Sequence, residues 1–299
     1  MPDWQERITA DSRPATRAEH ELRYALAAPL IRAAARWCDL GCGAGVAAAA
    51  ALGDEPYGGS ALLIDRDAAV ADAAAAAVQA REATALALDL ADGDALATLR
   101  STLAGDEPLV ITCFETIEHL SDFAPLVTLL TELAARPATT VLLSVPNDDF
   151  WAIENPHHAT LWGEGALSEL RSLLPAGHVA LRQVALQGTA LLPLDGEARA
   201  SASVALAPGV ASHLLLAFGA EAAKLGPALP ATRVVQADVV EQRRWERQRE
   251  SDLLYHVAAL RALEARLAET EAALAQATAA AAAPTAGEDD DAPAASGHA

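Results

Sequence analysis

The first two thirds of the chain alternate short apolar runs with alanine-rich segments. Apolar runs of strand length lie at 36–40, 60–65, 84–89, 109–114 and 139–145. The segments between them, such as 68–79 and 123–136, have helical composition. Strands that alternate with helices predict βαβ units and a parallel sheet covered by helices on both faces. We therefore expect an α/β fold with a doubly wound sheet.

The pattern changes on both sides of this region. Residues 1–36 predict a helical lead-in that is broken at Pro29. Two later apolar runs, 179–187 and 212–218, complete a domain that we expect to span 37–225. We expect a long helical segment at 234–280. The acidic tail, 281–299, has too little apolar surface to fold and is expected to be disordered.

The helical segment carries a leucine repeat within 241–276, a stretch without glycine or proline. Leu253, Leu260, Leu267 and Leu274 lie seven residues apart on this stretch. His256 and Thr270 are polar where a coiled coil prefers an apolar residue. The repeat predicts a coiled coil with a second copy or a partner helix, or a helix that folds back on its own domain.

Charge and composition narrow the class of protein. The formal charge is −20, with 41 acidic against 21 basic residues, and such a field repels nucleic acid. No apolar run has the length of a membrane span, and the N-terminus lacks the pattern of a secretory signal. Cys38, Cys42 and Cys113 have no zinc-like spacing, so we expect buried free thiols in the reducing cytoplasm.

The first predicted strand ends in a glycine-rich turn of the form D-x-G-x-G-x-G, residues 39–45. Glycines on alternate positions let the backbone turn sharply and approach a ligand closely. The dinucleotide fingerprint requires a further glycine where this chain has Val46. The Asp39 carboxylate repels a phosphate and suits a cationic ligand. Asp65 ends the next strand at a spacing that suits the hydroxyls of a ribose.

These residues resemble the first motifs of the class I S-adenosylmethionine-dependent methyltransferases, and the resemblance covers residues 15–220. It implies a Rossmann-like, seven-stranded, mostly parallel sheet whose last strand is antiparallel. Asp39 and the turn would hold the methionine part, Asp65 the ribose, and Asp89 the adenine, with a helix cap as the alternative role of Asp89. The implied cofactor-binding set is Asp39, Gly41, Cys42, Gly43, Gly45, Asp65, Arg66, Asp89, Leu90 and Phe114.

The fourth predicted strand is followed by Glu115-Thr116-Ile117-Glu118-His119. If the chain turns helical there, Glu115 lies over Glu118 and His119 on one face. Two carboxylates and an imidazole on one face bind a divalent cation or act as acid and base. A structural loop motif is the alternative interpretation.

This E-x-x-E-H motif is similar to that of the ubiquinone-pathway O-methyltransferases and the small-RNA 2′-O-methyltransferases, as is the S-x-P-N run 144–147. The resemblance implies a divalent cation such as Mg²⁺ at Glu115, Glu118 and His119. Asn147 or one of His157 and His158 would be its fourth ligand. Without a metal, His119 or His157 would be the general base. The expected catalytic set is His119, Glu118 and His157.

We therefore expect a methyltransferase that acts on an oxygen of a small-molecule or glycan acceptor. One alternative is an RNA 3′-end 2′-O-methyltransferase, which the E-x-x-E-H motif favours and the negative charge disfavours. Another is an inactive methyltransferase-like scaffold that works through its coiled coil.

Overall fold

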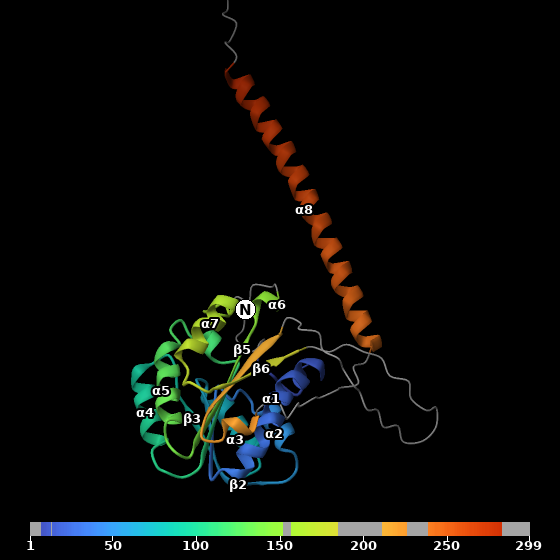
Figure 1. Ribbon diagram of the computed structural model, residues 1–299. Helices are drawn as coiled ribbons and strands as arrows, with labels where there is room; N and C mark the ends of the chain where they lie inside the picture. The colour runs from blue at the N-terminus through green and yellow to red at the C-terminus, as the bar shows by residue number, and fades with distance from the viewer. Residues whose placement is uncertain (1–6, 13, 152–156, 185–210, 226–238, 283–299) are drawn as a thin grey trace, which may run out of the picture. The chain divides into compact units, whose positions relative to one another are not determined.

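The computed structural model of the chain describes residues 7–12, 14–151, 157–184, 211–225 and 239–282 (Figure 1). The chain divides into two compact units, Met1–Val235 and Gln236–Ala299. The second unit contains α8 (Val239–Ala282). Of the expected tail, only residues 281 and 282 are described, at the end of α8. In the described part of the chain, no helix is both long and apolar enough to cross a bilayer.

A seven-stranded sheet forms the centre of the first unit. Its strands lie in the order β3 (Ala80–Ala87), β2 (Tyr57–Asp65), β1 (Arg36–Leu40), β4 (Leu109–Phe114), β5 (Thr139–Pro146), β7 (His213–Gly219) and β6 (Val179–Gln183). β7 is antiparallel to both of its neighbours, and the other pairs are parallel. The expected mostly parallel sheet with an antiparallel last strand is confirmed. The strand order reverses at β1 and β4, and a sheet of this kind binds ligands at the carboxyl ends beside that point.

Helices cover both faces of the sheet, as the doubly wound prediction requires (Figure 1). On one face, α1 (Pro14–Ala33), α2 (Val46–Leu52), α3 (Ala68–Ala77) and the 3₁₀ turn η3 (Ala222–Leu225) share a core with Trp37 and Leu63. On the other face, α4 (Gly93–Thr102), α5 (Ala124–Ala134) and α7 (Glu164–Leu173) share a core with Ile111 and Val141. The short elements are η2 (Ile117–His119) and α6 (Asp148–Trp151).

The burial of each strand explains how accurately the hydrophobic pattern predicted where that strand begins and ends. Every residue of β4 and β5 is buried, so these strands read as continuous apolar runs. β3 lies at the edge of the sheet and is largely accessible to solvent. Its first residues are polar, so the apolar pattern placed its start at residue 84 instead of Ala80.

The expected helix break at Pro29 is wrong, since α1 runs from Pro14 to Ala33 through that residue. Proline removes one backbone hydrogen bond and interrupts a helix most severely in its middle. Here Pro29 lies near the end of α1, where its neighbours Ala28, Leu30 and Ile31 are buried in the core. We attribute the continuity of the helix to this packing.

Candidate active site

The turn after β1 uses the left-handed backbone conformation at all three of its glycines. The φ angles of Gly41, Gly43 and Gly45 are 70°, 53° and 71°. A Cβ on Gly41 would collide with the Thr116 side chain, and one on Gly45 would lie 2.8 Å from the Cα of Ala74 in α3. Gly43 differs, because a Cβ there would meet no atom within 4 Å. Two glycines therefore pack the turn against the protein, and the third faces open space that a ligand can enter.

Asp65 joins this turn to the end of β2. Its Oδ2 accepts a hydrogen bond from the backbone N–H of Gly43 at 3.2 Å, and its Oδ1 accepts one from the N–H of Asp67 at 3.0 Å. Gly43 and Asp65, which are 22 positions apart in the sequence, are thus in direct contact. The carboxylate stands beside the open side of the turn, at the carboxyl ends of β1 and β2.

The segment before α1 also contacts this acid. A guanidinium nitrogen of Arg7 lies 3.2 Å from Asp65 Oδ1, and the other lies 3.5 Å from Asp67 Oδ2. Asp65 Oδ1 thus already accepts two hydrogen bonds, which is the usual capacity of a carboxylate oxygen. A ligand that binds both oxygens of Asp65 has to displace Arg7.

The Asp39 side chain is turned into the protein. Asp39 has no exposed surface. Tyr24 in α1 donates a hydrogen bond to Oδ2 at 2.9 Å, and Thr112 in β4 donates one to Oδ1 at 2.6 Å. Burial raises the pKa of Asp39 to about 7, although both hydrogen bonds favour its charged form. In this structure Asp39 ties α1, β1 and β4 together beneath the turn.

The other expected cofactor residues differ in their exposure to solvent. Asp89 is exposed, and its Oδ1 accepts a hydrogen bond from Ala91 N at 3.0 Å, whereas the N-cap of α4 is Asp92. Arg66 is exposed just after β2. The remaining side chains are buried: those of Cys42, Leu90 and Phe114. All three cysteines are buried and free, as expected.

The residue that follows β4 has a left-handed backbone conformation. Glu115 has a φ of 50° and is the one non-glycine residue with positive φ within the described ranges. A side chain of this size rarely adopts that conformation, and such outliers concentrate at functional sites. The 3₁₀ turn η2 begins only at Ile117. The expectation that Glu115 shares a helix face with Glu118 and His119 is therefore wrong.

Glu115 instead enters a polar cluster built by β5, β7 and α1. Ser144 Oγ donates to Oε1 at 2.6 Å, His213 Nε2 lies 3.2 Å from Oε2, and Arg23 Nη2 lies 4.0 Å from Oε1. Burial opposes the ionisation of Glu115, but Arg23 and His213 outweigh it and hold its pKa below the ordinary value. Burial lowers the pKa of the nearby His20 to about 3, and the Arg23 charge acts in the same direction. The cluster thus holds an ionised carboxylate at the end of β4.

One edge of the Arg23 guanidinium makes an ion pair with Glu115 but no hydrogen bond within the described residues. The residue is 2% exposed, and its Nη1 donates to Gln183 Oε1 at 2.9 Å. Its Nε and Nη2 atoms have no hydrogen-bond partner in the part of the chain that the structure describes. These two atoms form one edge of the guanidinium, and that edge matches the two oxygens of a carboxylate.

A second group of ligating side chains lies after β4. One atom each of Glu118, His119 and His158 lies within 4.8 Å of the others. Glu118 is buried and His119 is exposed. Of the two adjacent histidines, the structure brings His158 to this group, whereas His157 contributes its carbonyl oxygen, 3.1 Å from His119 Nδ1. Neither Glu115 nor the His157 imidazole belongs to it.

Oxygen atoms from residues outside this group orient both of its imidazoles. His119 Nδ1 faces the His157 carbonyl, and His158 Nδ1 lies 3.3 Å from Asp148 Oδ1. An Nδ1–H that donates to an oxygen leaves the lone pair on Nε2, as metal-binding histidines require. The other expected ligand, Asn147, is buried, and its Nδ2 donates to Ala211 O at 2.7 Å.

A match to a known family model identifies the family of this chain. The profile of a methyltransferase domain family matches residues 13–185, which is more than half of the chain. The chain belongs to this methyltransferase family. No curated protein matches it.

The methyltransferase is also similar to solved structures. A small RNA methyltransferase, HEN1, is 19% identical with a TM-score of 0.46, over 78% of this chain and 28% of that one. The methyltransferase domain of a bacterial Hen1 is 17% identical with a TM-score of 0.41, over 67% and 98% of the two chains. The O-methyltransferase TomG from Streptomyces achromogenes is 17% identical with a TM-score of 0.37, over 67% and 79%. The chain therefore spans about a quarter of the length of the first of these proteins.

The family implies S-adenosylmethionine as the cofactor, and the geometry of the methyltransferase fits it. Gly43 leaves an open approach to the turn, and Asp65 presents a carboxylate beside it. Three residues that the sequence did not predict contact the acids of the site: Arg7 contacts Asp65, and Arg23 and His213 contact Glu115. Each comes from a segment distant in sequence from the turn, so local motifs carried no signal for it.

Proposed function

We propose that the protein transfers the methyl group of S-adenosylmethionine to an oxygen of a small-molecule or glycan acceptor. The cofactor half of this proposal rests on the glycine turn, which is open at Gly43, where Asp65 accepts a hydrogen bond from the backbone. The cluster of Glu118, His119 and His158 supports the oxygen acceptor. The net charge of −20 supports an acceptor that is not a polyanion.

In this proposal the chain contacts each end of the cofactor with a different group. Asp65 accepts hydrogen bonds from the ribose hydroxyls after Arg7 has moved away. Gly43 lets the ligand approach the backbone, because a side chain at that position would fill the open space. The Nε–Nη2 edge of Arg23, which lies 4.0 Å from Glu115 and makes no hydrogen bond within the described residues, binds the carboxylate at the methionine end. Asp39 acts indirectly by holding Tyr24 and Thr112 under the turn.

Calorimetric titration with S-adenosylhomocysteine tests the cofactor site. We expect Gly43→Arg and Asp65→Ala to weaken binding by at least about tenfold, since one fills the approach and the other removes a charged acceptor. Gly53→Arg is the matched control. Gly53 also has a positive φ, 65°, and open space, but it lies at the other end of α2. Unchanged binding in both site variants would contradict the proposal.

On the acceptor side, we propose that Glu118, His119 and His158 hold a divalent cation. A bound cation supplies Lewis acidity, which lowers the pKa of an acceptor hydroxyl. One carboxylate and two imidazoles favour a transition metal such as Mn²⁺ over the expected Mg²⁺. Asp148 and the His157 carbonyl keep the two imidazoles in the ligating tautomer.

The cation proposal is tested by titrating the protein with Mn²⁺. We expect His158→Ala to weaken binding by at least about tenfold, because a ligand is lost. His157→Ala is the control, since it retains the backbone carbonyl and removes only a side chain outside the cluster. Equal affinities of wild type and His158→Ala would exclude this site. Such a result would leave His119 as the candidate general base.

The same cluster also favours a second candidate function, 2′-O-methylation of an RNA 3′ end. Filter binding of a short RNA at low salt separates the two functions. An RNA enzyme should bind with a steep salt dependence. We expect no such binding, because the chain has 20 more acidic than basic residues.

A further inference from the structure

The C-terminal helix α8 carries a row of leucines at seven-residue spacing. It is 44 residues long. Leu253, Leu260, Leu267 and Leu274 are 64%, 59%, 59% and 67% exposed, and Leu263 is 58% exposed. A row of exposed leucines at regular spacing marks an interaction surface.

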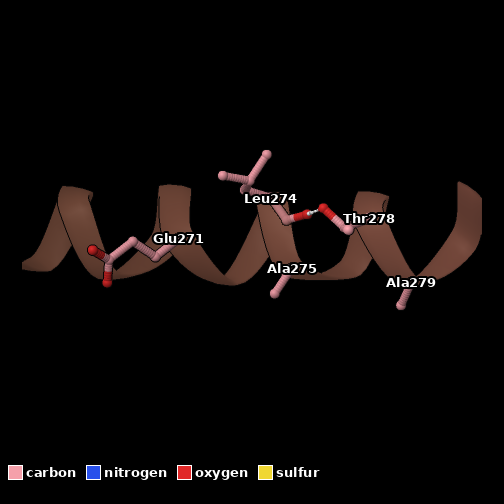
Figure 2. Close-up of a pocket in the computed structure, with 5 residues that line it drawn as sticks. All are labelled: Glu271, Leu274, Ala275, Thr278 and Ala279. Atoms are coloured by element: carbon pink, nitrogen blue, oxygen red, sulfur yellow. Dashed lines mark hydrogen bonds between the residues drawn. The ribbon is translucent and has the colours of Figure 1, made fainter. Parts of the chain in front are cut away.

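The helix surface between these leucines has no built ligand site. The residues that line a hollow on this surface all belong to α8, and Figure 2 shows them on the helix: Glu271, Leu274, Ala275, Thr278 and Ala279. The one hydrogen bond drawn there is internal to the helix, from Thr278 Oγ1 to Leu274 O at 2.8 Å. The surface fits a neighbouring helix better than a small molecule.

The seven-residue spacing of the leucines indicates how a second helix would pack against α8. Leucines that recur every seventh residue drift by about 20° per repeat around a straight α-helix. A left-handed supercoil with a second helix compensates for this drift and keeps the row at the contact. With the leucines at position a of the heptad, position d holds His256, Leu263, Thr270 and Ala277. The two polar d residues reduce stability and favour one register.

Charges beside the row favour a second copy in parallel orientation. In this register, Arg266 occupies position g and Glu271 occupies position e of the next heptad. A parallel pair of identical helices places each Arg266 against Glu271 of the partner helix, and the contact occurs twice by symmetry. An antiparallel pair instead brings e positions together, where Glu264 and Glu271 repel. We infer that α8 of two copies forms a parallel two-stranded coiled coil, so that the methyltransferase is a homodimer.

Sedimentation velocity on the full chain over roughly two orders of magnitude in concentration measures this association. We expect a concentration-dependent shift from monomer to dimer. Arg266→Glu should weaken the dimer by about fivefold to tenfold, because two attractive contacts become repulsive. Adding Glu271→Arg to that variant should restore the affinity. A monomer at every concentration, or a double variant as weak as Arg266→Glu, would overturn the inference.

Orientation is tested by oxidative crosslinking of the full chain. Thr270→Cys places a thiol at a d position, where the two copies meet only in a parallel pair. Ala258→Cys is the control, because its f position faces away from the partner, and the three native cysteines are buried. We expect a crosslinked dimer for Thr270→Cys alone. No crosslink, or equal crosslinking of both variants, would contradict the parallel arrangement.

Discussion

At the scale of single residues, we propose that Asp39 acts on the glycine turn without touching the ligand. Its sequence position next to the glycine turn suggests a direct contact with a cationic cofactor. Its complete burial and its hydrogen bonds to Tyr24 and Thr112 instead fix the geometry of the turn. The functional consequence is a turn whose shape depends on α1 and β4.

Burial of Asp39 predicts a specific pH dependence of stability. Its pKa rises from 3.8 to about 7 on folding, so between these values the folded state holds a proton that the unfolded state has lost. The free energy of unfolding should therefore fall as the pH rises through this window. Asp39→Asn cannot titrate, so its stability relative to wild type should increase over the window, by about 1 kcal/mol or more. Urea denaturation of both proteins from pH 4 to pH 7 measures this difference, and a constant difference would contradict it.

At the scale of elements, the turn after β1 also fixes how α2 meets α3. Gly45 lies at the N-cap of α2 with a left-handed backbone, and a Cβ there would lie 2.8 Å from the Cα of Ala74. This contact positions the turn relative to the helix that follows Asp65. The cofactor site therefore depends on helix packing as well as on the motif.

Gly45→Ala should destabilise the protein by about 1–3 kcal/mol, because the added Cβ meets the α3 backbone and the φ of 71° is strained. Gly43→Ala has the same kind of strain and no collision, so it should cost only about 1 kcal/mol. The difference in the free energy of unfolding between the two variants, measured by thermal and urea unfolding, isolates the contribution of packing between the turn and α3. Equal losses would show that α2 and α3 do not constrain the turn.

Local pattern was sufficient to predict the parallel strands, their flanking helices and the glycine turn, because these features depend on neighbouring residues. The resemblance to methyltransferases was needed to predict seven strands with an antiparallel last one. The partners of Glu115 were not predictable, since Arg23, Ser144 and His213 come from three separate elements. The left-handed backbone at Glu115 also removed it from the expected helix face. Of His157 and His158, only the fold decides which imidazole joins Glu118 and His119.

At the scale of the whole molecule, we propose that methyl transfer and assembly belong to separate parts. The lead-in, 1–36, and the domain at 37–225 would form the catalytic part, and 234–280 would mediate pairing. The division of the chain near Val235 supports this arrangement.

Truncation after residue 235 tests this arrangement. We expect the shortened protein to bind S-adenosylhomocysteine with the affinity of the full chain, and to be monomeric. The reason is that the described cofactor and acceptor residues all lie within the first unit. A loss of binding on truncation would show that the C-terminal helix helps to build the site.

The central claim is that the glycine turn after β1, together with Asp65 at the end of β2, binds S-adenosylmethionine. A crystal structure of the protein grown with S-adenosylhomocysteine tests it most directly. We predict the ribose hydroxyls within hydrogen-bonding distance of Asp65, with Arg7 displaced and the ligand passing over Gly43. An empty glycine turn in crystals grown with saturating ligand would contradict the account.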